Sequence, residues 1–381
     1  MTRGPAPHAK RGQESPLKIP VYQPDLTGNE KRYVNECLDS TWISSKGKFV
    51  NAFESAFADY VGVEHAASVS NGTVAVHLCC LALGLGPGDE VIVPTFTYIA
   101  SVNPLRYVGA TPVFVDSLRD TWQMDPEDVR RKITPRTKAI MAVHLYGCPC
   151  DMPAIMAIAE AHGLKVIEDC AEAMGSTIDG RHVGTFGDMA AFSFFGNKTI
   201  TTGEGGMVVT NDPALHDLAT RMKGQGLAKD KTYWHDVLGH NFRMTNICAA
   251  IGVAQMERID ATLNAKRDLA RRYAERLEGL PVELHRAPSE DVLHTYWMVS
   301  ILVPDGTRDR VMAHLAEAGV ETRPLFYPVH SMPIYAEHND ERHPVGGEIA
   351  RRGINLPSWP GLSDVQLDII VGHLSEALTH G

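Results

Sequence analysis

Short apolar runs alternate with amphipathic stretches along most of the chain. The runs Glu90–Pro94, Thr111–Val115 and Lys138–Val143 are rich in valine and isoleucine, which is typical of buried strands. The amphipathic stretches between them have the periodicity and length of helices. Further strands are expected at His65–Ser70, Leu164–Ile167, Ala190–Phe194 and Met207–Thr210, and helices at Thr27–Asp39, Val50–Val61, Val74–Leu83, Thr97–Tyr107 and Asp151–His162.

This alternation predicts an α/β fold: a mainly parallel central sheet with helices on both faces. A long charged helix, Met256–Leu280, then leads to a smaller α+β domain with its own strand and helix. The predicted boundaries are a large domain over residues 17–260 and a small C-terminal domain over residues 261–381. Residues 1–16 carry basic charge and prolines but no apolar core of signal-peptide length, so a disordered tail is expected there.

Composition narrows the class of protein. The chain has 381 residues and a formal net charge of −10, which argues against a nucleic-acid partner and against binding to an anionic membrane. It contains no run of about 18 apolar residues, so no membrane span is expected. The seven cysteines show no CxxC spacing. Reduced thiols in a cytoplasmic protein, without a metal site, are therefore expected.

Polar residues follow the predicted strands, at the edge where ligands bind in open α/β sheets. Asp169 ends one apolar strand. Its carboxylate has two interpretations: it faces water or caps the next helix, or it pairs with a protonated ring nitrogen at the floor of a pocket. Pyridoxal phosphate (PLP) needs such a partner, because a carboxylate keeps its ring charged and able to withdraw electrons.

Lys198 lies between a run of aromatic residues and the glycine-rich turn TTGEGG. A charged amine in apolar surroundings is costly, so this lysine either reaches water or is used for its amine chemistry. It follows Asp169 by 29 residues (198 − 169), enough for one more strand that returns to the same sheet edge. A partly desolvated lysine can form a Schiff base and, once released, can carry protons. Lys198 and Asp169 are therefore the catalytic candidates.

The turn Asn71–Thr73 joins a predicted strand to a predicted helix. Amide groups and a hydroxyl at a helix N-terminus form an anion site, although the same residues serve equally as a helix cap. Ser193 could add a second hydroxyl. Tyr98 follows a strand end and is either a core residue or a ring stacked on a flat cofactor. The chain has no GxxxxGK[ST], GxSxG or HExxH motif, which argues against an NTPase P-loop, a nucleophile elbow or a zincin site.

Taken together, a series of short motifs between Thr41 and Gly252 closely resembles the DegT–StrS family of PLP-dependent sugar aminotransferases. The likeness extends over nearly the whole chain from about Lys18 and implies the aspartate-aminotransferase fold, fold type I. The motifs are TWISSKGKFV, NGTVAVHL, PTFTYIAS, VHLYG, VIEDCAEAMG, FSFFGNKTITTGEGG, GQG and NFRMTNICAAIG.

The resemblance implies roles for individual residues around the cofactor. Lys198 corresponds to the lysine that binds PLP covalently, and Asp169 to the partner of the ring nitrogen. Tyr98 corresponds to the aromatic residue that stacks on the ring. Glu172 corresponds to a neighbour of the ring hydroxyl or of the substrate.

The resemblance also implies a phosphate site and a homodimer. Gly72, Thr73 and Ser193 correspond to phosphate contacts, and Asn246 to a residue that reaches the phosphate from the partner subunit. The active sites would then be shared between two copies of the chain.

The implied reaction transfers an amino group from L-glutamate to a nucleotide-linked 4-keto-6-deoxy sugar. Among family members, the motifs resemble most those that convert GDP-4-keto-6-deoxymannose into GDP-perosamine. Several loop residues could line the sugar-nucleotide pocket, and ordinary loop packing is the alternative explanation for each of them. These substrate candidates are Trp42, Ser44, His144, Arg323, Tyr327 and His330.

Four alternatives remain at this point. The substrate could be a dTDP- or UDP-linked keto sugar that is aminated at C3 or C4. The protein could be a PLP-dependent sugar dehydratase, although relatives with that activity carry histidine where this chain keeps Lys198. It could be a regulatory protein that retains the fold. It could also be a simple nucleotide-binding α/β protein, but the chain lacks a GxGxxG motif after a strand.

Overall fold

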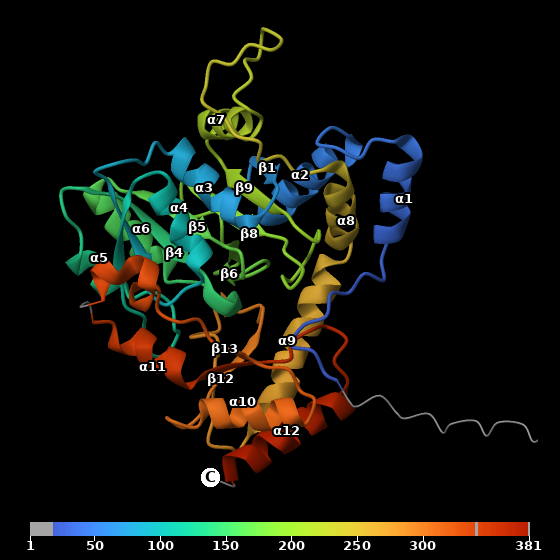
Figure 1. Ribbon diagram of the computed structural model, residues 1–381, viewed down its shortest axis with the longest axis vertical. Helices are drawn as coiled ribbons and strands as arrows, with labels where there is room; N and C mark the ends of the chain where they lie inside the picture. The colour runs from blue at the N-terminus through green and yellow to red at the C-terminus, as the bar shows by residue number, and fades with distance from the viewer. Residues whose placement is uncertain (1–17, 340–341, 380–381) are drawn as a thin grey trace, which may run out of the picture.

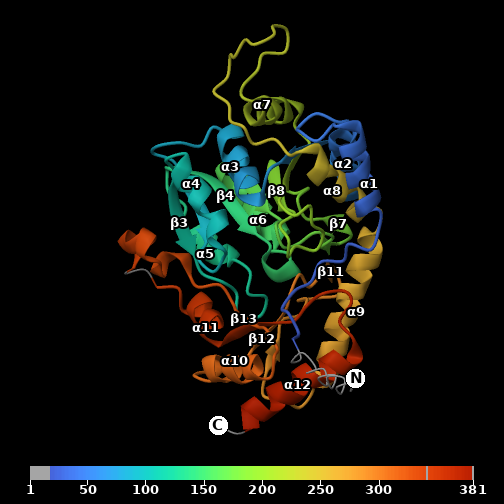
Figure 2. The same ribbon diagram turned by 45° about the vertical axis from the view of Figure 1, so that its right-hand side comes forward.

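The computed structural model describes residues 18–339 and 342–379 (Figures 1 and 2). The predicted tail over residues 1–16 lies outside the described residues. Within them, a large α/β unit carries the longer, N-terminal part of the chain, and a smaller α+β unit packs below it in the view of Figure 1. No helix in this part of the chain is long and apolar enough to cross a membrane.

A seven-stranded sheet forms the centre of the large unit, in the order β1-β9-β8-β5-β4-β2-β3. Pairs β2–β3, β2–β4, β4–β5 and β5–β8 are parallel, whereas β9 runs antiparallel to both of its neighbours. The prediction of a mainly parallel sheet is confirmed. The strands are β1 (His65–Val69), β2 (Glu90–Pro94), β3 (Thr111–Val115), β4 (Thr137–Val143), β5 (Lys165–Asp169), β8 (Met189–Ser193) and β9 (Gly206–Thr210).

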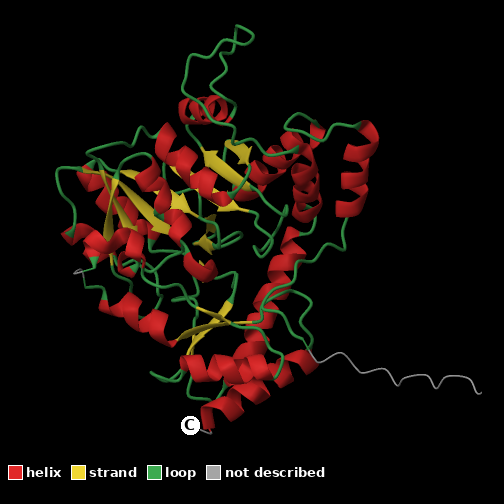
Figure 3. Cartoon of the chain, in the orientation of Figure 1, coloured by secondary structure: helices red, strands yellow, loops and turns green. Residues whose placement is uncertain are grey.

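Helices cover both faces of this sheet (Figure 3). Val91 and Val93 pack into the apolar cluster with α3, α4 and α7, whereas Ile92 between them packs into the cluster with α5 and α6. Helices α2 and α8 cover β8, β9 and β1. The alternation along β2 explains why a strand buried on both faces reads as a continuous apolar run. The helices are α1 (Glu30–Ser40), α2 (Lys48–Val61), α3 (Gly72–Ala82), α4 (Asn103–Tyr107), α5 (Pro126–Arg131), α6 (Met152–His162), α7 (Pro213–Lys223) and α8 (Asn246–Met256).

Two predicted helices differ in the structure. Helix α1 begins at Glu30 and not at Thr27, which donates hydrogen bonds to Asp25 instead. The single helix expected over Thr97–Tyr107 is divided into the short 3₁₀-helix η1 (Ile99–Ser101) and α4. Pro104 explains the division, because proline lacks the N–H that would continue a helical ladder and its ring restricts the residue before it.

The C-terminal unit is built on an antiparallel sheet in the order β10-β12-β14-β13. Its core also contains Ile19, which pairs with Val320 in an isolated bridge. The segment that begins at Lys18 therefore packs with the C-terminal unit, whereas the predicted boundaries place it in the large domain. The elements are α9 (Ile259–Leu277), β10 (Glu283–Leu284), β12 (Val299–Leu302), α10 (Arg308–Glu317), β13 (Arg323–Pro324), α11 (Pro344–Arg352), β14 (Gly353–Leu356) and α12 (Asp364–Thr379).

A third, small sheet has the order β11-β6-β7 and combines two strands from the first part of the sequence with one from the C-terminal part. Its strands are β6 (Thr177–Ile178), β7 (Arg181–His182) and β11 (Val292–Leu293), and the remaining 3₁₀-helices are η2 (Leu145–Gly147), η3 (Val329–Ser331) and η4 (Pro333–His338).

Candidate active site

The carboxyl ends of β1 and β8 bring two predicted phosphate contacts together. A Cβ atom added at Gly72 would lie 2.7 Å from Cβ of Ser193, so α3 begins directly against the end of β8. Asn71 caps this helix, with its Oδ1 accepting a hydrogen bond from the Val74 amide at 3.0 Å. The first amides of α3, at Gly72 and Thr73, have no acceptor within the helix. They are available to an anion beside the hydroxyl of Ser193.

Asp169 ends β5 with only 4% of its surface exposed. Its Oδ2 accepts a hydrogen bond from the Ser101 hydroxyl at 2.7 Å, and its Oδ1 accepts one from the Ala171 amide at 3.1 Å. Ser101 in turn lies 3.1 Å from the hydroxyl of Thr97. The carboxylate is therefore buried and held in one orientation at the sheet edge.

Lys198 and Glu172 form an ion pair at the same edge. The Lys198 Nζ lies 3.3 Å from Glu172 Oε1, and the other carboxylate oxygen accepts a hydrogen bond from the Tyr146 amide at 3.0 Å. Burial raises the pKa of Glu172, against the opposing effects of Lys198 and of the Tyr146 amide. The Lys198 side chain is 14% exposed, so its amine is largely shielded from water but accessible.

An aromatic layer lies beside these groups. The Tyr98 ring is 5.5 Å from the ring of Phe326, which stacks on Tyr146 at 5.3 Å. Tyr98 is 55% exposed. It is therefore not a core residue, and one face of the layer is open to a flat ligand.

Asn246 lies at the start of α8 and is almost fully buried. Its side-chain amide donates to the Trp42 carbonyl at 2.7 Å, and its Oδ1 accepts from the Phe49 amide at 3.0 Å. Trp42 and Asn246 line a cavity of about 350 Å³, and the Ser44 carbonyl accepts a hydrogen bond from the Asn246 main-chain amide. Asn246 thus holds the loop that carries the two early substrate candidates. Its contact with the phosphate in a partner subunit stays a prediction.

His144 is fully buried, and both of its ring nitrogens are bonded within the protein. The Cys150 amide donates to Nδ1 at 3.0 Å, and Nε2 lies 3.2 Å from the Glu168 carboxylate. Burial alone would raise the pKa of Glu168, but hydrogen bonds from His144 and from the Gly184 amide hold it below its usual value. The assignment of His144 to the substrate pocket therefore does not fit the structure, because the ring offers neither surface nor a free nitrogen.

The three C-terminal substrate candidates lie on one segment that reaches the end of β2. His330 Nδ1 is 2.6 Å from the hydroxyl of Thr95, and Tyr327 is exposed next to Phe326 of the aromatic layer. Arg323 is also exposed, with its guanidinium donating to Glu321 at 2.7 Å. Tyr327 and His330 are thus close to the strand edge, whereas Arg323 is engaged by a neighbouring carboxylate.

Sequence reasoning missed several residues that contact the candidates, among them three that lie against the buried charges. Tyr146 follows β4 at the carboxyl edge, and this position could have revealed it. Ser101 stands within the TYIAS motif, but nothing in the sequence around it indicates its hydrogen bond to Asp169. Trp297, whose ring centroid lies 3.9 Å from Lys198 Nζ, comes from a distant part of the chain and has no local signal.

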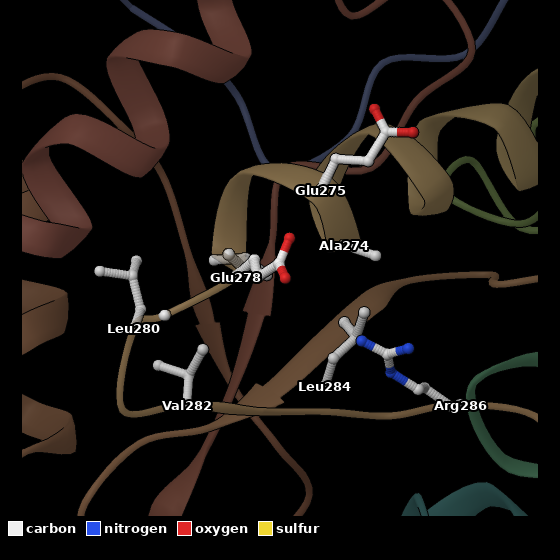
Figure 4. Close-up of a pocket in the computed structure, with 9 residues that line it drawn as sticks. Ala274, Glu275, Glu278, Leu280, Val282, Leu284 and Arg286 are labelled. Carbon is white, nitrogen blue, oxygen red and sulfur yellow. The ribbon is translucent and has the colours of Figure 1, made fainter.

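A larger cavity, of about 460 Å³, lies at the C-terminal end of α9 (Figure 4). Leu280, Val282 and Leu284 form its aliphatic wall, with Glu275 and Arg286 at its sides. None of the candidate residues lines it. The strand edge, where buried charges converge, is therefore the better candidate for chemistry than the larger cavity.

Comparisons with known proteins address the family of the chain. A profile of the DegT/DnrJ/EryC1/StrS aminotransferase family matches residues 24–375. The chain is 59% identical over 359 residues to GDP-perosamine synthase from Escherichia coli O157:H7, covering 94% of this chain and 98% of that protein. It is 52% identical over 354 residues to GDP-perosamine synthase from Vibrio cholerae, covering 92% of this chain and 96% of that one.

Solved structures give the same result. The aminotransferase TlmJ from Streptoalloteichus hindustanus superposes with a TM-score of 0.90 at 30% identity, covering 94% of this chain and 98% of that one. The sugar aminotransferase Spr1654 from Streptococcus pneumoniae, in its PLP form, superposes with a TM-score of 0.90 at 28% identity, covering 95% and 98%. The resemblance and the fold type inferred from the motifs are confirmed: the chain belongs to the DegT/DnrJ/EryC1/StrS aminotransferase family.

Proposed function

We propose that this chain is a PLP-dependent aminotransferase that converts GDP-4-keto-6-deoxymannose into GDP-perosamine, with L-glutamate as the amino donor. The observation that carries the chemistry is the Lys198–Glu172 pair at the strand edge that also holds Asp169. The substrate follows from two relatives named GDP-perosamine synthase, at 59% and 52% identity over nearly the whole chain.

The residues at the strand edge fit PLP. At Gly72 the lack of a side chain lets the backbone lie against Ser193, leaving the first amides of α3 open to the cofactor phosphate. Asp169 is a buried carboxylate that can bind the protonated ring nitrogen. The open face of Tyr98 can stack on the ring. Bound there, PLP would supply the ring that withdraws electrons and the carbon that carries the amino group between substrates.

The chain's own groups would then handle the protons. The Lys198 amine would bind the cofactor carbon and, once displaced by the amino donor, would move a proton from the donor's Cα. Glu172 would hold the free amine close by, since it already pairs with it at 3.3 Å. Asp169 would keep the ring-nitrogen proton in place while negative charge develops at Cα.

We propose that the early loop and the C-terminal segment both contribute residues to the pocket for the sugar nucleotide. Trp42 and Tyr327 are more than half exposed and offer aromatic faces to a base or a sugar. Ser44 and His330 would supply polar contacts beside them. Arg323 would reach an anionic group only by leaving Glu321.

A homodimer with shared sites forms part of the proposal. The segment over residues 225–240 projects beyond α7 (Figure 1) and exposes Tyr233 at 88% and Leu238 at 86%. Apolar side chains so exposed are typical of an interaction surface, and a second copy of the chain would cover them.

We also place the enzyme in the cytoplasm, because all seven cysteines lie within the described residues and are free thiols.

Absorbance spectroscopy followed by product analysis tests the function. The purified protein reconstituted with PLP should show a visible band that L-glutamate alone converts to that of the aminated cofactor. The glutamate-treated enzyme should then aminate GDP-4-keto-6-deoxymannose at C4, as identified by mass spectrometry and NMR, and should aminate a dTDP-linked 4-keto sugar far more slowly. A band indifferent to glutamate, or a deoxygenated product, would instead favour a dehydratase or a regulatory role.

A further inference from the structure

Two aromatic side chains hold consecutive carbonyl groups of the segment that carries Lys198. Trp297 Nε1 donates a hydrogen bond to the Asn197 carbonyl at 2.7 Å. The Tyr22 hydroxyl donates one to the Lys198 carbonyl, also at 2.7 Å. The peptide bond between Asn197 and Lys198 and the one after it are therefore both fixed from outside the segment.

The main chain around Lys198 has few other hydrogen bonds, whereas Thr201 and Thr202 just after it both bond to the Phe194 carbonyl. It lies outside the regular strands, between β8 and β9, and continues into a glycine-rich turn in which Gly203 has a positive φ of 83°. The Lys198 amide itself bonds only to the nearby Phe195 carbonyl, at 2.9 Å. The two aromatic donors therefore fix the main chain at Asn197 and Lys198 themselves, ahead of the glycine-rich turn.

Tyr22 and Trp297 are themselves firmly anchored. Tyr22 packs against the apolar clusters of both the large unit and the C-terminal unit. Its neighbour Val21 accepts a hydrogen bond from the Ser358 amide at 2.9 Å, which ties it to the C-terminal unit. Trp297 is only 5% exposed and lies two residues before β12 begins at Val299. The donors thus connect the Lys198 segment to the C-terminal unit.

Trp297 also faces the amine directly. The centroid of its ring lies 3.9 Å from Lys198 Nζ, within the range of a cation–π interaction. The same side chain therefore fixes the backbone before Lys198 through its N–H and limits the direction of the Lys198 side chain through its ring.

We propose that Tyr22 and Trp297 are positioning residues for Lys198, which couple the direction of its amine to the placement of the C-terminal unit. The proposal rests on the role given to Lys198 under the proposed function. It adds that a displacement of the C-terminal unit is transmitted to Lys198 through these two hydrogen bonds and through the Trp297 ring.

Tyr22→Phe is the sharpest variant, because it removes the hydroxyl and keeps the ring. Tyr273→Phe is its matched control: the Tyr273 hydroxyl also donates to a main-chain carbonyl, that of Pro357 at 2.9 Å, but it lies within the C-terminal core. Hydrogen–deuterium exchange of the apoprotein should show amides of residues 195–203 exchanging about tenfold faster in Tyr22→Phe, the loosening expected from one lost hydrogen bond. Tyr273→Phe should leave this segment unchanged.

The holoenzyme provides a second readout. Tyr22→Phe should lower kcat about tenfold while KM for L-glutamate changes less than twofold. Trp297→Phe should also lower the pH at which the visible absorbance band changes by half. The smaller ring stabilises the protonated Lys198 nitrogen less, and the indole N–H that anchors the Asn197 carbonyl is lost. Tyr273→Phe should change neither property.

Equal exchange in the two tyrosine variants, with unshifted absorbance in Trp297→Phe, would overturn the proposal and leave both residues as ordinary packing. The substrate can fail separately. If the wild type converts its visible band with glutamate but does not aminate the GDP-linked sugar, the exchange and absorbance results still decide the role of Tyr22 and Trp297.

Discussion

Glu172 joins the amine of Lys198 to the main chain of Tyr146: one carboxylate oxygen lies 3.3 Å from Lys198 Nζ, and the other accepts the Tyr146 amide at 3.0 Å. The ion pair is therefore fixed to the end of β4. Because burial raises the pKa of Glu172, its negative charge is lost at a higher pH than for an ordinary glutamate.

Glu172→Gln tests this relationship. The amide keeps an oxygen for the Tyr146 N–H but loses the charge, so kcat/KM should fall by about tenfold or more. In the wild type, kcat/KM should decline as the pH falls through the raised pKa, since Glu172 is ionised above that pKa and protonated below it. A pH profile measured from 5 to 8 should lack this acid limb in the variant. An identical limb in both enzymes would contradict the assignment.

Asp169→Asn should abolish most turnover while the fold persists. The substitution keeps the size of the side chain and an oxygen for the Ser101 hydroxyl, but it removes the charge that would hold a proton on the ring nitrogen. We expect kcat to fall by about 100-fold or more. Ser101→Ala is the control, because it removes one hydrogen bond to Asp169 and leaves the charge, so a smaller loss is expected. Wild-type kcat in Asp169→Asn would refute the role of the carboxylate.

Gly72→Ala should weaken cofactor binding. The new Cβ would lie 2.7 Å from Cβ of Ser193, so α3 must shift away from the end of β8 and its amides must move with it. The apparent Kd for PLP, measured by titration of the apoprotein, should rise about tenfold.

Gly372→Ala is the matched control for Gly72→Ala. Gly372 is exposed within α12 and a Cβ there meets no atom within 4 Å. This variant should gain about 0.5–1 kcal/mol of stability from helix propensity and bind PLP normally. An unchanged Kd in Gly72→Ala would show that the phosphate binds elsewhere.

Lys266→Met should make the protein's stability less dependent on pH. Lys266 is 1% exposed, and burial lowers its pKa to about 7. Between that value and the unfolded pKa of about 10.4, the unfolded chain holds one more proton, so raising the pH stabilises the folded wild type by up to about 1.4 kcal/mol per unit. The methionine variant cannot take up this proton, so its stability lacks this dependence on pH.

Urea unfolding of both proteins at pH 7 and pH 9 measures the effect. At pH 7 the free energy of unfolding should be larger for the variant than for the wild type, and this difference should be smaller at pH 9. An advantage that stays the same at both values would mean that Lys266 is buried in its charged form, held by the Ser358 carbonyl at 3.0 Å.

The candidate site was partly predictable from sequence, and there is a physical reason why some of its residues were predicted correctly and others were not. Asp169 and Ser193 end apolar strands and Gly72 follows one shortly after, and parallel strands carry their carboxyl ends to one edge. Local pattern could not separate Asp169 from His144, since both stand at the carboxyl end of an apolar strand. The direction in which the side chain leaves the sheet decides between them, and that depends on packing against helices distant in sequence.

Residues that act across long distances in the chain escaped prediction. Tyr22 reaches Lys198 over 176 positions, and Trp297 reaches Asn197 over 100. No periodicity or motif near either aromatic residue reports its partner. The same limit explains Ile19, whose place in the C-terminal core depends on its bridge to Val320.

The pairing of β1 with β9 sets an order of events during synthesis. His65 pairs with Thr210, and Val69 pairs with Gly206, so among the described strands the one that precedes the turn at Gly72 finds its sheet neighbour, β9, far along the chain. Pairing between segments so distant is slow, because a long loop must close before any contact forms. A nascent chain released before Thr210 would leave β1 unpaired and the start of α3 without its platform. The phosphate site is therefore expected to be completed late, after most of the large unit has left the ribosome, and cofactor capture should follow folding rather than guide its first steps.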